Sequence, residues 1–134
     1  MVYYKFTGPY MNSFNDFGKL MEYINTNEIP MGPYALGVFY DDPAQVPEDQ
    51  LKSEAGYMVQ EEVEVSDNFF YKKIPAGKAV SLKYHSMEEI MPAYEAIAKF
   101  MQEKEIKTVP YSIEIYYSPD PSVVDAEILF LIKD

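Results

Sequence analysis

The feature of this sequence that most restricts its fold is an internal repeat. The segment 2–6 matches 80–84, and the segment 33–40 matches 110–117, with offsets of 78 and 77 residues. A unit of this length that occurs twice favours a pseudo-two-fold domain over a solenoid, because a solenoid needs three or more short units.

Each repeat has the pattern strand, helix, strand, strand. We therefore expect an α+β fold, a tandem repeat of two β-α-β-β units whose antiparallel sheets carry two main helices. The chain should form one domain, 1–134, with repeat one at about 1–66 and repeat two at about 67–134. The seam between the units should form a groove, and ligand sites favour such concavities. The helices have matched apolar positions, namely Phe17, Leu20 and Ile24 in the first and Tyr94, Ile97 and Met101 in the second.

The expected strands are apolar or alternating runs bounded by Gly, Pro, Asn and Asp. The run 56–65 begins as a strand and then alternates valine with glutamate, which is typical of an edge strand with one wet face. The last run, 126–132, is continuously apolar from Ile128 onwards and should be a central strand covered on both faces. The other expected strands are 2–6, 33–40, 69–73, 78–84 and one within 109–121.

Both helices have N-terminal signals. Ser13 with Asp16, and Ser86 with Glu89, resemble capping boxes. Pro92 lies too deep for the first turn of the second helix. Either that helix kinks at Pro92, or a short turn precedes a helix in which Pro92 is near the first position.

The two repeats begin differently. A strand at 69–73 and a turn at 74–77 precede the second repeat's first matched segment, whereas the first repeat begins abruptly at Val2. We therefore expect an upstream strand, or a longer N-terminal segment, in the natural gene product.

One strand carries a charge in an unusual setting. Within 109–121, one face holds Tyr111, Ile113, Ile115 and Tyr117, and the other holds Ser112, Glu114 and Tyr116. A buried unpaired charge is costly, so a lone carboxylate is exposed, neutralised or available to a cation. We expect Glu114 to form the floor of a small-molecule site. The alternative is a solvated glutamate on the outer face of an antiparallel strand.

Charge and composition exclude several classes of function. The formal charge is −11, and the chain contains no arginine. Because arginine supplies most bidentate contacts to phosphate and guanine, we expect no direct nucleic-acid binding, whereas a cationic ligand or a basic partner would be attracted. The absence of cysteine excludes disulfides and thiolate chemistry. No apolar run approaches the ~20 residues of a membrane span, so we expect a cytoplasmic location and no membrane contact by this segment.

Other polar residues give weaker signals. Asp41, Asp42 and Asp120 lie at equivalent loop ends, where Asp-Asp-Pro and Pro-Asp-Pro indicate turns more simply than a calcium site. His85 is the only histidine and is expected in a solvated turn. Because the sequence contains no catalytic triad, phosphate-binding loop or zinc pattern, we expect no cofactor and no metal.

Three short motifs together resemble one family. They are 37–43 (GVFYDDP), 74–77 (IPAG) and 114–116 (EIY), the last followed by Asp120 and Pro121. In order and spacing, over essentially the whole chain, they resemble the GyrI-like small-molecule-binding domain, also known as the effector-binding domain of bacterial transcription regulators. Residues 37–59 also resemble a eukaryotic member that serves as a membrane-anchored autophagy receptor. Unlike the regulators, this sequence has no helix-turn-helix.

The resemblance implies two β-α-β-β units whose sheets frame a ligand groove. In family members that bind lipophilic cations, an acidic residue of the strand matching 111–117 faces this groove among aromatic rings. Glu114 occupies that place here, and its two-fold equivalent is the much smaller Gly37. The ligand-binding residues expected on this basis are Glu114, Tyr116, Phe39, Tyr57 and Gly37.

Three functions remain open. The first is a module that binds or senses a lipophilic or cationic small molecule, in which no residue is catalytic. The second is a protein-interaction module, whose acidic surface binds a basic partner or an upstream domain. The third, implied by some family members, is a hydrolase with Glu114 as general base and Tyr116 as hydrogen-bond donor. We favour the first.

Overall fold

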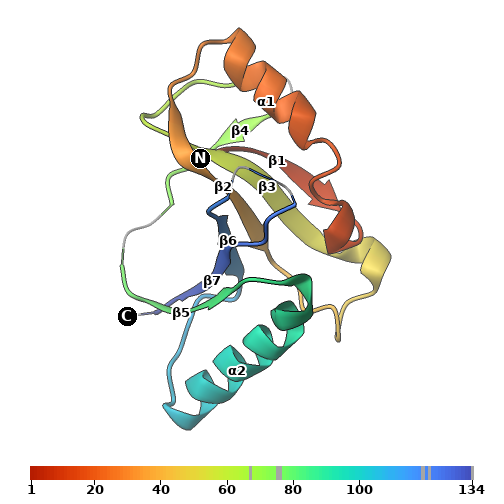
Figure 1. Cartoon of the computed structure of the whole chain (residues 1–134), viewed down its shortest axis with the longest axis vertical. Coiled ribbons are helices and arrows are strands. Elements are labelled where there is room, and N and C mark those ends of the chain that lie inside the picture. The colour runs from red at the N-terminus through yellow and green to blue at the C-terminus, as the bar shows by residue number, and fades with distance from the viewer. Residues whose placement is uncertain (67, 75–76, 119, 121, 134) are drawn as a thin grey trace.

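In the computed structural model, residues 1–66, 68–74, 77–118, 120 and 122–133 are described, and they form one antiparallel sheet with two α-helices (Figure 1). The strands are β1 (Val2–Thr7), β2 (Met31–Phe39), β3 (Lys52–Val59), β4 (Phe70–Tyr71), β5 (Ala79–Tyr84), β6 (Ser112–Tyr116) and β7 (Ala126–Leu131). The helices are α1 (Phe17–Thr26) and α2 (Ile90–Glu103), with short 3-10 turns at Tyr10–Asn12, Glu48–Gln50 and Met87–Glu89.

The sheet has the strand order β4-β1-β3-β2-β6-β7-β5. Without β4 this order is symmetric, because β1-β3-β2 of the first repeat meets β6-β7-β5 of the second. At the centre, Gly37 of β2 pairs with Glu114 of β6, and these two residues are equivalent in the sequence repeat. A pseudo-two-fold axis therefore passes between them, and the predicted α+β fold with two duplicated units is confirmed.

Both helices pack on one face of the sheet, called here the helix-bearing face. Leu20 and Ile24 of α1 are fully buried against a cluster that includes Ala55 of β3. Ala93 and Ile97 of α2 are buried against Val80, Tyr84, Ala126 and Ile128. Figure 1 shows α1 beside the β1 end of the sheet and α2 beside the β5 end. The central strands β2 and β6 therefore lie between the two helices.

The opposite face carries no α-helix in the described chain and is called the helix-free face. It has its own core, in which Leu36, Val38 and Ile113 are almost fully buried. The last strand, β7, is internal as predicted, and Ile128 on its helix-bearing side is fully buried. Its helix-free side is less covered than predicted, because Leu129 and Leu131 are only partly buried there.

Two central strands have other bounds than predicted. The strand expected within 109–121 is limited to Ser112–Tyr116. The strand expected at 56–65 starts earlier, at Lys52, and ends at Val59, and it lies between β1 and β2 and not at an edge. The valine–glutamate alternation beyond it has another cause. Val63 and Val65 pack on the α1 cluster from a segment without regular structure, so their alternation with glutamate misled the prediction.

The predicted capping boxes do not form. Ser13 ends the 3-10 turn Tyr10–Asn12, and its Oγ donates to the carbonyl of Tyr10. It is therefore not available to cap α1, which starts only at Phe17. Glu89 accepts a hydrogen bond of 2.7 Å from the backbone N–H of His85, so it reaches one residue beyond Ser86.

Pro92 is the third residue of α2, behind the turn Met87–Glu89, so the second of the two predicted arrangements is correct. The strand predicted at 69–73 is only Phe70–Tyr71, and it pairs with β1 of the first repeat. The turn predicted at 74–77 includes Pro75 and Ala76, which lie outside the described residues, as does Pro121 of the third sequence motif.

Candidate functional site

Glu114 lies at the centre of the molecule. The alternation predicted for its strand is confirmed. Ser112, Glu114 and Tyr116 point to the helix-bearing face, while Ile113 and Ile115 belong to the helix-free core. Glu114 is only 6% exposed, so it is not the solvated glutamate of the alternative hypothesis.

Three tyrosine hydroxyls converge on this carboxylate. Tyr84, at the end of β5, donates to Oε1 at 2.5 Å, and Tyr94 of α2 donates to Oε2 at 2.6 Å. Tyr116, two residues along β6, donates to Oε1 at 3.5 Å. Short hydrogen bonds to an ionised acceptor are the stronger kind, so both carboxylate oxygens are well solvated by the protein.

Burial is the largest influence on the pKa of each group in this cluster. Burial raises the pKa of Glu114, and the three tyrosine hydrogen bonds offset this only in part. Burial and the neighbouring carboxylate also raise the pKa of Tyr84, Tyr94 and Tyr116, so the phenols stay neutral donors. Hydrogen bonds stabilise the charge of Glu114, but they do not neutralise it.

A second buried carboxylate shows the contrast. Glu54 of β3, on the helix-free face, is 5% exposed and forms an ion pair of 2.5 Å with Lys72. Among the described residues, Glu114 has no lysine or histidine within ion-pair distance. The fold thus supplies a cation to one of these two carboxylates and leaves the other with phenols alone.

The repeat divides the surroundings of Glu114 into a polar half and an apolar half. Its hydroxyl donors come from the second repeat, and the matched positions of the first repeat hold phenylalanine. The matched pairs are Tyr84 with Phe6, Tyr94 with Phe17, and Tyr116 with Phe39, while Glu114 matches Gly37. Of these three phenylalanines, Phe39 lies directly beside Gly37.

The other predicted site residues lie near Glu114, and the space between them is filled. The ring of Phe39 comes within 2.9 Å of where a Cβ on Gly37 would stand, and the Tyr116 hydroxyl within 3.1 Å. The volume that Gly37 leaves is therefore occupied by these two side chains. Tyr57 is on the same face, but Ala35 separates it from Tyr116 in the pairing register. Their roles in binding stay predictions.

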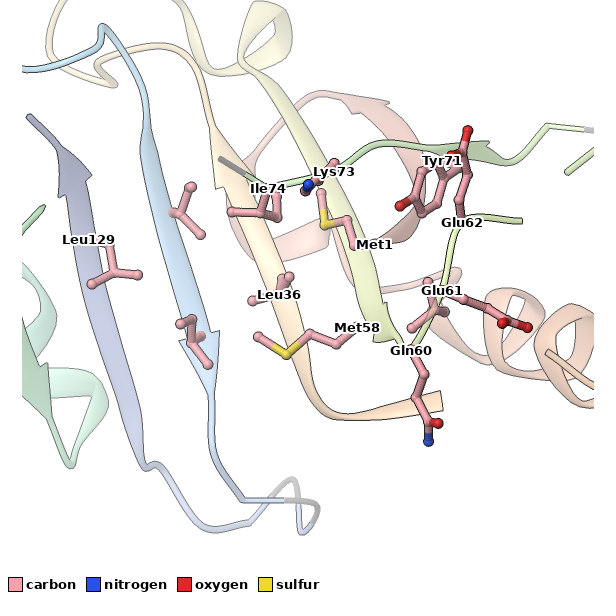
Figure 2. A pocket seen from close by; sticks show the side chains of 13 residues that line it. Met1, Leu36, Met58, Gln60, Glu61, Glu62, Tyr71, Lys73, Ile74 and Leu129 are labelled. Atoms are coloured by element: carbon pink, nitrogen blue, oxygen red, sulfur yellow. The ribbon is translucent and has the colours of Figure 1, made fainter. Parts of the chain in front are cut away.

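A hollow of about 480 Å³ lies elsewhere, on the helix-free face (Figure 2). Its apolar lining includes Leu36, Met58 and Leu129, and Gln60, Glu61 and Glu62 contribute polar groups at one side. Ile113 and Ile115, which flank Glu114 in sequence, also line it. The hollow and Glu114 thus use opposite faces of β6. Met1, whose N-terminal ammonium donates to the carbonyl of Lys72, also lines the hollow.

The weaker candidates have structural roles. Asp41 accepts from the backbone N–H of Lys52, and Asp42 and Asp120 accept from backbone N–H groups two residues ahead. His85 is 64% exposed in its side chain, as expected for a turn. No group of three His, Asp or Glu side chains suited to a metal occurs within the residues that the structure describes.

The sequence interpretation missed Tyr84 and Tyr94. Both were available as signals, because Tyr84 ends a strand and Tyr94 aligns with the core residue Phe17 of the first helix. A buried carboxylate needs hydrogen-bond donors, so a search for hydroxyls at inward-facing positions would have included them among several candidate donors without showing which of them reach Glu114.

Comparisons with known proteins give a consistent result. A family model described as the GyrI-like small molecule binding domain matches residues 1–133. The EcmrR–DNA complex determined by cryo-electron microscopy is similar, with a TM-score of 0.74 and 18% identity over 99% of this chain and 53% of that chain. The crystal structure of the EcmrR C-terminal domain has a TM-score of 0.71 and 18% identity over 99% of this chain and 91% of that chain. The chain therefore spans about half the length of the EcmrR chain in the complex.

Among curated protein sequences, none matches the chain. In the part of the chain that the structure describes, no helix is long and apolar enough to cross a membrane.

Proposed function

The chain belongs to the GyrI-like family of small-molecule-binding domains, and on this premise we propose that it binds a lipophilic organic cation at Glu114. The observation that carries the proposal is a buried carboxylate that three phenols solvate and that no ion pair among the described residues neutralises. A bound cation would supply the missing charge, and the tyrosine rings would add cation–π attraction of about 0.5–2 kcal/mol each.

The apolar half of the surroundings supports a lipophilic ligand over a simple ammonium ion. Phe14 packs edge-on against Tyr116 with ring centroids 5.3 Å apart, and Phe39 packs edge-on against Tyr10 at 4.9 Å. These rings continue the aromatic surface from the carboxylate into the first repeat. A ligand with a charged centre and an aromatic or branched apolar group would use both parts.

Binding requires side chains to move, because the space beside Gly37 is filled. Tyr94 projects from α2 onto Glu114, so a shift of this helix or a rotamer change of Tyr94 would open one oxygen of the carboxylate. Binding to such a pre-filled site selects or induces an open form, and its free energy includes the cost of opening.

The test is isothermal calorimetry with benzyltrimethylammonium and with neopentylbenzene, its uncharged isostere. We expect the cation to bind the wild-type protein and the Glu114→Gln variant to bind it at least about tenfold more weakly. Glu61→Gln, at an exposed position, is the matched control and should leave binding unchanged. Equal affinities of wild type and Glu114→Gln would show that Glu114 does not anchor the ligand.

The proposal also covers nucleic acid as a partner. The charge of −11 disfavours direct contact with nucleic acid, so an effect on DNA would need another module. The hydrolase alternative gains no separate support from the site, because the Phe39 ring and the Tyr116 hydroxyl fill the space beside Gly37, where a substrate and its attacking water would have to stand.

A further inference from the structure

The duplication also places two glutamates at equivalent positions on the helix-free face. Val38 of β2 pairs with Glu54 of β3, and Ile115 of β6, the repeat equivalent of Val38, pairs with Glu127 of β7. Glu54 and Glu127 are therefore equivalent under the pseudo-two-fold axis, as are Tyr40 and Tyr117. The ring partners also match, because Tyr40 packs on Tyr111 at 5.4 Å and Tyr117 packs on Tyr34 at 4.7 Å.

In the first copy, this arrangement holds an ammonium group. Lys72 Nζ donates to Glu54 Oε1 at 2.5 Å and to the Tyr40 hydroxyl at 3.0 Å. It also lies 4.6 Å from the centroid of the Tyr3 ring and 5.7 Å from that of Tyr40. Burial lowers the pKa of Lys72, but these hydrogen bonds outweigh burial and raise the pKa overall. The first copy is thus a carboxylate–tyrosine cage whose occupant is the chain's own lysine.

In the second copy, the carboxylate and one ring of the cage are present, because Glu127 matches Glu54 and Tyr117 matches Tyr40, and Tyr34 adds a ring that packs on Tyr117. Tyr117 donates to Glu127 Oε1 at 2.5 Å, and the hydrogen bond to Glu127, with burial, raises the pKa of Tyr117 to about 12. Among the described residues, no ammonium group lies within ion-pair distance of Glu127. Glu127, Tyr117 and Tyr34 are half-buried, so a side chain from outside can reach them.

We propose that Glu127, Tyr117 and Tyr34 form a binding site for the alkylammonium group of a lysine side chain of a partner protein. The occupied first copy shows which chemistry this arrangement accepts. The formal charge of −11 favours approach of a basic partner. This site lies on the face opposite to Glu114, so it is separate from the proposed small-molecule site.

Two differences between the copies define the strength of the site. Ser81 stands where the first copy has Tyr3, so one ring of the cage is missing. Lys83 Nζ lies 5.3 Å from the centroid of the Tyr117 ring and repels an incoming cation. A single lysine contact of this kind is expected to have a dissociation constant of the order of a millimolar.

The test follows the ring signals of Tyr117 and Tyr34 by NMR during titration with Nα-acetyl-lysine methylamide. The matched uncharged probe is the same compound acetylated on Nε. We expect saturable shifts of both rings with the charged probe only. Glu127→Gln should weaken binding about tenfold, while Glu61→Gln, at an exposed position, should leave it unchanged. Lys83→Gln should strengthen binding about two- to threefold, because a like charge is removed.

Three outcomes would overturn the proposal. The first is a linear, unsaturable response of the rings, which indicates non-specific attraction to the acidic surface. The second is equal binding by wild type and Glu127→Gln. The third is loss of binding in Lys83→Gln, which would place the contact elsewhere. Loss of binding in Glu114→Gln with retention in Glu127→Gln would assign the cation to the small-molecule site and refute the site at Glu127.

Discussion

The substitution Glu114→Gln should make the protein more stable at neutral pH, although it removes a carboxylate that accepts hydrogen bonds from three tyrosines. Burying an ionised carboxylate costs several kcal/mol. Two hydrogen bonds at 2.5 and 2.6 Å offset this by ~1.5–3 kcal/mol each. Because burial still raises the pKa of Glu114, the balance is unfavourable to the charge, and we expect a net gain of about 1–2 kcal/mol.

The effect must depend on pH with a defined sign. The pKa of Glu114 is raised in the folded state above its ordinary value of 4.5. Its contribution to stability is therefore fully present below this value and is lost as the pH rises through the folded pKa. Glu114→Gln has no such loss. Its advantage over the wild type should be small near pH 4.5 and should grow towards neutral pH.

The assay is thermal and urea unfolding of both proteins between about pH 5 and about pH 8. For a chain of 134 residues, the expected gain corresponds to a rise in Tm of about 4–7 °C. Glu54→Gln is the matched control and should lower stability by about 1–3 kcal/mol, because it leaves Lys72 without its carboxylate. A Glu114→Gln variant that is less stable than wild type at pH 8, or a difference that ignores pH, would refute the reasoning.

Three further predictions concern single contacts. Tyr94→Phe removes the hydrogen bond of 2.6 Å to Glu114 and should raise the pKa of Glu114 further, measured by NMR titration of its carboxyl carbon; an unchanged pKa would contradict the assigned donor. Gly37→Ala places a methyl group 2.9 Å from the Phe39 ring and should cost about 1–3 kcal/mol in urea unfolding, whereas a neutral effect would mean that the ring moves freely. Lys72→Met leaves Glu54 buried without its cation and should lower stability by about 2–4 kcal/mol, so a variant as stable as the wild type would show that the ion pair contributes nothing.

The arrangement of the sheet was predictable because a repeat constrains both halves at once. Matching 33–40 with 110–117 identified Gly37 and Glu114 as equivalent, and the two residues pair at the centre of the sheet. Strand alternation then fixed the face on which Glu114 lies. These steps need only local periodicity and a duplicated pattern, both of which a single sequence contains.

The partners of Glu114 were not predictable in the same way. Tyr94 reaches it only because α2 packs over β5 and β7 with one particular rotation, and no local pattern specifies that rotation. The same holds for Lys72, which meets Glu54 from the position directly after β4, the two-residue strand that pairs with β1. Contacts between segments distant in sequence depend on packing of the whole core, so periodicity alone does not reveal them.

The strand prediction for the segment after β3 was wrong for a different reason. Alternation of valine with glutamate indicates one apolar and one polar side, and Val63 and Val65 do contact the α1 cluster. The pattern does not specify a hydrogen-bonded neighbour, which a strand requires. An irregular segment lying along an apolar surface gives the same sequence signal.

The central claim is that a lipophilic cation binds beside Glu114, and the most direct measurement is the set of NOEs from the methyl protons of bound benzyltrimethylammonium to the protein. The account predicts NOEs to the rings of Tyr84, Tyr94 and Tyr116. NOEs to the methyl groups of Ile115 and Leu129 instead would place the ligand in the hollow of the helix-free face and contradict the claim.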